Sequence, residues 1–124
     1  MAKGLDKHRE YVDALNLLGK QLARRAKSKC ELSGEPGTLA AFDLIGEPTE
    51  PDLEHVLLVC PAVREHLEGR GLDDRDALRY LDEAVWNPQR VVRTAAIRIL
   101  ELIDEPWARD ARENARSMDA YDEG

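Results

Sequence analysis

The sequence is poor in the groups that usually mark an exported protein or a membrane protein. It has two cysteines, Cys30 and Cys60, among 124 residues. No apolar run approaches the roughly 18 residues of a membrane span, and the charged start MAKGLDKHRE lacks the apolar stretch of a secretory signal. We therefore expect a soluble, cytoplasmic chain with no membrane partner, in which both cysteines are reduced thiols.

Recognisable catalytic and nucleotide-binding motifs are also missing. The sequence has no phosphate-cradling glycine loop and no dinucleotide fingerprint. His8, His55 and His66 are scattered, and Cys60 and His66 share one short predicted helix without an oxyanion motif. We expect His55 and His66 at the surface. The sequence thus predicts no enzyme activity, no catalytic residue and no cofactor.

Charge is distributed unevenly along the chain. The net charge is -7, but residues 1–30 carry eight Lys or Arg against three acids, whereas the remainder carries ten Arg against twenty-two acids. An acidic chain disfavours nucleic-acid binding. The segment KQLARRAKSK still offers a basic contact face, which keeps nucleic-acid binding open as an alternative. That face comprises Lys20, Arg24, Arg25, Lys27 and Lys29.

The pattern of apolar residues predicts a mostly helical α+β fold. Residues 6–27 form one amphipathic helix with apolar side chains every three or four positions. Residues 38–45 and 54–60 have the composition of two strands of an antiparallel hairpin, and a short helix follows over 61–69. The apolar stripe of the first helix is long for the core of so short a chain, which leaves a symmetric dimer open.

The last third of the chain is predicted to be helical. Helices are expected over 73–86 and 89–103, and a further helix restarts at Pro106. From about Ser117 the chain is polar and acidic, and we expect it to fray. One domain therefore spans residues 1–124, with a basic amphipathic helix (1–29), a hairpin and helix (30–69), a helical region (70–116) and an acidic tail (117–124).

Each cysteine opens a frame in which a second metal ligand is missing. The frames read Cys30-Glu31-Leu32-Ser33-Gly34 and Cys60-Pro61-Ala62-Val63. A cysteine in a turn, a hairpin, and a cysteine at a helix start are the layout of a treble-clef zinc site. There each frame supplies two thiolates about 2.3 Å from the ion. Ser33 and Val63 replace the second thiolates here, so we predict a relic site without metal.

Three segments of the chain together resemble a bacterial family. They read KCELSGEPGTLAAFDL, HVLLVCPAV and LRYLDEAVWNPQRVVRTAAIRILELIDEPWARD, within roughly residues 20–112. The chain resembles the N-terminal, zinc-ribbon-bearing region of the PhnA-like proteins. The resemblance implies a treble-clef knuckle in which four cysteines hold zinc, and this sequence departs from it at Ser33 and Val63.

These features predict a non-enzymatic PhnA-like domain of unknown role that acts through protein contacts or self-association. Its partner is an unidentified protein or a second copy of the chain. Two alternatives stay open: a nucleic-acid-binding accessory protein that uses residues 20–29, and a thiol redox sensor. The sensor requires Cys30 and Cys60 to be neighbours, which we expect because both would have faced the same ion.

Overall fold

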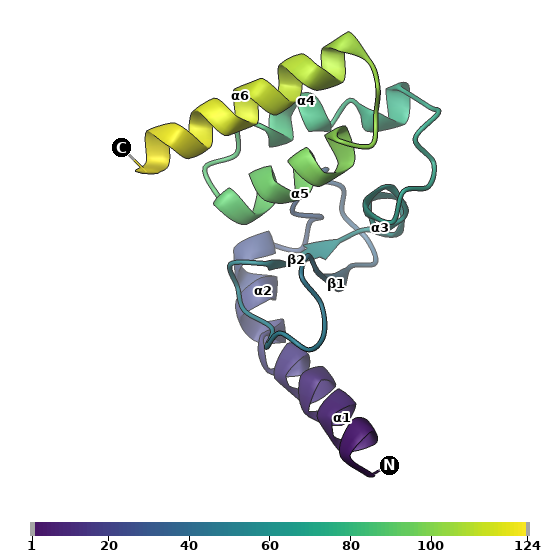
Figure 1. Cartoon of the computed structure of the whole chain (residues 1–124), viewed down its shortest axis with the longest axis vertical. Coiled ribbons are helices and arrows are strands. Elements are labelled where there is room, and N and C mark those ends of the chain that lie inside the picture. Colours follow the sequence, from purple (N-terminus) through teal and green to yellow (C-terminus); the bar gives the residue numbers. More distant parts are fainter. Residues whose placement is uncertain (1, 124) are drawn as a thin grey trace.

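The computed structural model describes the backbone of residues 2–123 and the side chains of residues 6–122. Its fold is the mostly helical α+β arrangement predicted from the sequence (Figure 1). A bent N-terminal helix leads into a two-stranded antiparallel hairpin, and helices follow to the C-terminal end. The hairpin lies between the N-terminal helical arm and the C-terminal helices, so it joins the two parts of the molecule.

The N-terminal helix is bent rather than continuous. It consists of α1 (Ala2–Leu17) and α2 (Gly19–Ala26), where a single helix over 6–27 was predicted. At the bend, the N–H of Leu18 donates to the carbonyl of Leu15, three residues back, at 3.2 Å. Glycine in a helix interior weakens the helix, and Gly19 directly follows this turn. As a result α1 extends away from the body of the protein (Figure 1).

The two predicted strands pair as expected. β1 (Ala40–Asp43) runs antiparallel to β2 (Val56–Val59), with Ala40 opposite Val59 and Asp43 opposite Val56. Most of β2 is buried and is built from Val and Leu, residue types that favour the pleated conformation. On the other side of β2, the N–H of Glu31 donates to the carbonyl of Leu58 at 2.9 Å. The cysteine turn is therefore attached to the free edge of the hairpin.

The hydrophobic core is centred on α5 (Arg90–Leu100), as the strong amphipathic pattern of residues 89–103 predicts. The elements packed against α5 are β2, α3 (Pro61–Leu67), α4 (Leu81–Ala84) and α6 (Pro106–Glu123). The side of α5 toward them is fully apolar apart from Arg93, with Val92, Ala96 and Ile99 buried. Figure 1 shows α5 lying between α6 and the hairpin.

The predicted helix over 73–86 is wrong. This segment forms only a 3-10 turn, η1 (Asp76–Leu78), and the single turn α4. The buried side chains of the segment are Leu78, Leu81, Ala84 and Val85. Spacings of three and four residues suit an α-helix as well as a 3-10 helix, so the pattern of buried residues does not by itself reveal the tighter winding. Asp74 starts the turn by accepting the N–H of Asp76 at 3.1 Å.

The acidic C-terminal segment is ordered, so the expectation of a frayed tail is wrong. α6 continues to Glu123 because two of its acids pair with Arg93, which is fully buried. Arg93 Nε donates to Asp119 at 2.7 Å, and its Nη2 donates to Asp122. Its Nη1 donates to the carbonyls of Asn87 and Pro88 at 2.7 and 3.1 Å. One side chain therefore joins α5, α6 and the turn before α5.

We expect Arg93→Met to lower the free energy of unfolding by about 2 to 3 kcal/mol, because two carboxylates and two carbonyls lose a charged donor. Urea denaturation followed by circular dichroism measures the change. Arg116→Met is the control, since Arg116 is exposed and lies 3.5 Å from Glu101. That variant should lose less than about 0.5 kcal/mol. Equal losses in the two variants would show that the Arg93 contacts contribute little.

Candidate functional site

The first cysteine lies in a tight turn that follows α2. The N–H of Cys30 donates to the carbonyl of Glu35, and the N–H of Gly34 donates to the carbonyl of Cys30, both at 2.8 Å. Gly34 has a φ of 79°, a left-handed conformation that glycine adopts without a steric penalty. The Ser-Gly pair therefore closes the turn and aims the backbone of Ser33 toward the Cys30 side chain.

The second cysteine lies where β2 ends and α3 begins. Cys60 has extended dihedral angles, with φ -77° and ψ 164°, and Pro61 occupies the first turn of α3. Proline is favoured there because its fixed φ suits a helix and its missing N–H would have no intrahelical partner. Val63, one turn into α3, is buried. Cys60 and Val63 thus enter the site from the same helix start.

The structure brings the residues of the predicted relic site together. The N–H of Ser33 donates to Cys30 Sγ at 3.4 Å, and Ser33 Oγ lies 3.7 Å from Cys60 Sγ. The backbone of Cys60 also lowers the pKa of the Cys30 thiol, so the start of α3 lies close to the first sulfur. Val63 lines the same hollow as Ser33 and Cys60, so all four positions belong to one site.

The donor set of this site does not fit a structural zinc ion. Two thiols remain, and both are free. Ser33 offers a weakly ligating hydroxyl, and Val63 offers no donor, so a closed tetrahedral shell is two ligands short. Among residues 2–123, no group of three or more His, Cys, Asp or Glu is placed to hold a metal ion.

The environment of Cys30 favours its thiolate. Burial raises the pKa of this thiol, but hydrogen bonds from the Ser33 hydroxyl and from the N–H groups of Ser33, Cys60 and Leu32 together lower the pKa below its ordinary value. The neighbouring Tyr80 shows the opposite effect. Burial, followed by the charges of the two cysteines, raises the pKa of Tyr80, so its hydroxyl remains protonated.

His66 completes the site, although we expected it at the surface. It is buried, its Nδ1 lies 2.7 Å from the Tyr80 hydroxyl, and the two rings stack with centroids 5.8 Å apart. Burial lowers the pKa of His66, which outweighs the opposing effect of Glu65 and Asp74. His66 and Tyr80 line a hollow of about 350 Å³ together with Ser33 and Cys60.

A second cluster that the sequence did not reveal holds α1 against the hairpin. Asp43, at the end of β1, accepts the Tyr11 hydroxyl at 2.8 Å and lies 3.0 Å from Nδ1 of His55. Burial and the bond to Asp43 raise the pKa of Tyr11 to about 12. His55 is mostly buried, contrary to the expectation of a surface histidine. These polar groups satisfy one another and anchor the helix.

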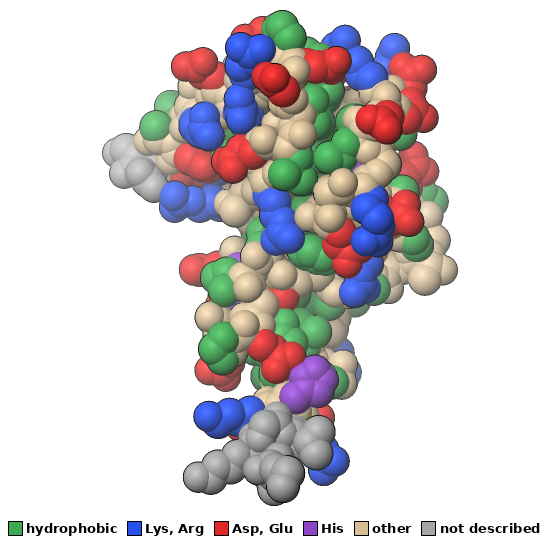
Figure 2. All heavy atoms as spheres, turned by 45° about the vertical axis from the view of Figure 1, so that its right-hand side comes forward, with side chains coloured by type: hydrophobic (Ala, Val, Ile, Leu, Met, Phe, Trp, Pro, Cys, Tyr) green, Lys and Arg blue, Asp and Glu red, His purple; other side chains and the backbone are tan. Residues whose placement is uncertain are grey.

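The predicted basic face loses one of its five members to the interior. Lys20, Arg24, Lys27 and Lys29 are exposed. Arg25 instead points inward, where its guanidinium pairs with Glu31 at 2.6 Å and donates to the carbonyls of Leu53 and Val56 at 2.8 and 2.7 Å. On the face seen in Figure 2, acidic and basic side chains are interspersed over the body. A surface of mixed charge supports nucleic-acid binding less than the basic segment of the sequence did.

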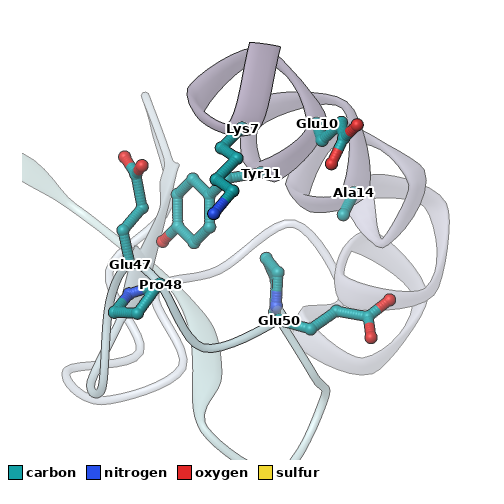
Figure 3. Close-up of a pocket in the computed structure, with 8 residues that line it drawn as sticks. Lys7, Glu10, Tyr11, Ala14, Glu47, Pro48 and Glu50 are labelled. Atoms are coloured by element: carbon teal, nitrogen blue, oxygen red, sulfur yellow. The ribbon is translucent and has the colours of Figure 1, made fainter. Parts of the chain in front are cut away.

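A hollow of about 470 Å³ lies between α1 and the loop that joins the strands (Figure 3). Lys7 and Tyr11 extend from α1 toward Glu47 and Pro48 of the loop. The other lining residues are Glu10, Ala14, Glu50 and Pro51. The hollow shows that α1 is attached to the loop at a few points rather than packed along its length.

Comparison with known proteins gives no relative for this chain. It matches no family model, no curated protein and no solved structure. In the part of the chain that the structure describes, no helix is both long enough and apolar enough to cross a bilayer. The function must therefore be inferred from the geometry of the site and the surface.

We expect the protein to lose stability between pH 7.5 and 5.5 through His66. Its folded pKa lies below the unfolded value of about 6.5, so the unfolded chain binds the proton first, and stability falls as pH drops through that value. Urea midpoints at the two pH values measure this loss. His66→Phe retains the aromatic contact with Tyr80 and removes the titration, so its loss should be smaller. An unchanged loss in that variant would assign the effect to other groups.

Proposed function

We propose that the chain is a non-enzymatic PhnA-like domain whose zinc knuckle has lost its metal, and that it acts by self-association along α1. The observation that carries the relic knuckle is the contact of Ser33 Oγ with Cys60 Sγ at 3.7 Å. In a four-cysteine knuckle, the residue at this position would direct a thiolate toward the second half of the site. Here a serine occupies the same place.

Packing and an ion pair take over the role of the ion in this proposal. Val63 fills space beside the two sulfurs from inside the core. Glu31 holds the turn from the other side, because its carboxylate accepts both Arg25 and the N–H of Leu58 at 2.9 Å. A metal that binds only the folded chain contributes its binding energy to folding, so these contacts must supply that energy when no ion is bound.

Restoring the missing ligands tests the relic knuckle. We expect Ser33→Cys combined with Val63→Cys to bind one zinc ion per chain, because four thiolates would then surround one point. Elemental analysis of the purified protein measures this. The Ser33→Ala, Val63→Ala double variant is the control and should contain no zinc, like the original chain. Absence of zinc from the double cysteine variant, or stoichiometric zinc in the original chain, would contradict the proposal.

The self-association surface is inferred from the position of α1. This helix has 16 residues, and isolated helices of about 12 to 15 residues are only marginally stable in water. Yet α1 extends from the body, with a hollow beneath it (Figures 1 and 3). The side chains of Tyr11 and Leu15 are only partly covered. Val12 extends the same apolar stripe and is 37% exposed. A second molecule that covers the stripe would stabilise the helix.

Charge complementarity supports a second copy of the chain as that molecule. Exposed basic side chains lie where the helical arm joins the rest of the molecule, namely Lys20 and Arg24 on α2 and Lys27 and Lys29 directly after it. Residues 31–124 carry an excess of acids. In a two-fold symmetric dimer, each arm can lie against the acidic body of the other copy, so both contacts form at once. Association of this kind weakens as salt concentration rises.

A charge on the apolar stripe should prevent this association. We expect the original chain to dimerise with rising concentration in sedimentation velocity experiments, and Val12→Glu to weaken dimerisation at least tenfold, because a buried unpaired carboxylate costs more than about 1.4 kcal/mol. Leu17→Glu is the matched control: Leu17 is 80% exposed on another side of the same helix. A chain that stays monomeric, or equal effects of the two substitutions, would contradict the proposed surface.

A further inference from the structure

The two cysteines differ in their access to solvent although they share one site. Cys30 is 2% exposed and lies behind the turn. Cys60 is only partly buried and lines the hollow of about 350 Å³ beside Ser33, His66 and Tyr80. A small reagent that enters this hollow therefore meets Cys60, whereas Cys30 does not line it.

The two sulfurs both lie beside the same residue, Ser33. The backbone of Cys60 lowers the pKa of the Cys30 thiol, so the main chain that bears the second sulfur lies close to the first. Rotation about the Cα–Cβ bond of Cys60 moves its Sγ relative to Cys30. Ser33 touches both sulfurs, at 3.4 Å through its N–H and at 3.7 Å through its hydroxyl. Both sulfurs are therefore within reach of one serine, and a disulfide forms when they approach each other to about 2.05 Å.

The donors around Cys30 prepare it to act as a nucleophile. The N–H of Ser33 donates to its sulfur at 3.4 Å, and the Ser33 hydroxyl and the backbones of Cys60 and Leu32 also lower the pKa of this thiol. Hydrogen bonds of this kind stabilise a thiolate, which is the form that attacks an oxidised sulfur. No metal competes for this thiolate, because the donor set around it does not fit zinc. The site thus combines an accessible thiol with a buried nucleophile.

We propose that Cys60 and Cys30 form a peroxide-sensitive pair that closes into an intramolecular disulfide. Cys60 is oxidised first, and Cys30 is the resolving thiol. Cys60 Sγ, as the thiolate, attacks one oxygen of hydrogen peroxide. The S–O bond forms while the O–O bond breaks, which gives a sulfenic acid and, after proton uptake, water. The Cys30 thiolate then attacks Cys60 Sγ, the S–S bond forms, the S–O bond breaks, and the departing hydroxide takes a proton to become a second water.

The balance of this reaction is complete. Two thiols lose two electrons and two protons, and one hydrogen peroxide is reduced to two waters. The disulfide joins the turn after α2 to the start of α3, which the isolated thiols connect only through hydrogen bonds. Oxidation therefore replaces a weak link by a covalent one at the point where a metal would have joined the same elements. The proposed disulfide formation does not depend on self-association through α1.

The full chain tests the pair directly. After treatment with a small molar excess of hydrogen peroxide, the protein is denatured, its remaining thiols are blocked with N-ethylmaleimide, and the intact mass is measured. We expect a mass loss of two hydrogen atoms, no maleimide adduct, and recovery of two adducts after dithiothreitol. The outcomes that would overturn the pair are two thiols that stay free, sulfinic acid at Cys60 with Cys30 still free, or disulfide-linked dimers.

Single variants test the order of attack. With Cys30→Ser, peroxide should leave a sulfenic acid on Cys60 that dimedone labels stoichiometrically. With Cys60→Ser, the buried Cys30 should remain mostly unlabelled. Equal labelling, or stronger labelling of Cys30, would overturn the assigned roles. Circular dichroism and unfolding midpoints check that both variants are folded. The thiol content of the original chain after peroxide treatment shows whether the disulfide forms, even if a variant fails to fold.

Discussion

The ion pair between Arg25 and Glu31 holds together the parts of the molecule on which the site depends. Glu31 is almost completely buried, and both of its oxygens are used: Oε2 accepts Arg25 Nε, and Oε1 accepts Arg25 Nη2 and the N–H of Leu58. Arg25 also caps carbonyls of the loop and of β2. The pair therefore joins α2, the cysteine turn and the hairpin, and a carboxylate buried this deeply is stable only when its partners are in place.

This constraint explains how the turn can keep its shape without a bound ion. Cys30 directly precedes Glu31, so the carboxylate that anchors Glu31 also fixes the position of the first sulfur. The second sulfur is fixed independently, because Cys60 ends a buried strand and begins a helix. The two halves meet at Ser33. The site is thus assembled by secondary structure and one internal ion pair.

The sequence predicted the elements that repeat a strong local pattern and missed the contacts made at a distance. The two strands and α5 followed from β-branched runs and from apolar residues at helical spacing, and Pro61 located the start of α3. His66 was misjudged because its partner, Tyr80, lies fourteen residues away, across a segment whose turns wind more tightly than an α-helix. Nothing in the local sequence around Arg25 or around the acids of the C-terminal end indicates that these charges have a partner inside the molecule.

The packing of α6 on α5 illustrates what a buried charge can specify. The residues through which α6 enters the core are small and alike, namely Ala108, Ala111 and Ala115. Such a smooth surface offers few side chains to interlock with α5, so α6 could slide along α5 by a turn at little cost in apolar contact. Arg93 removes that freedom, because any slide carries Asp119 and Asp122 away and leaves a guanidinium stranded in the core. The ion pairs of Arg93 thus select one register between α5 and α6, although the apolar faces of the two helices would accept several.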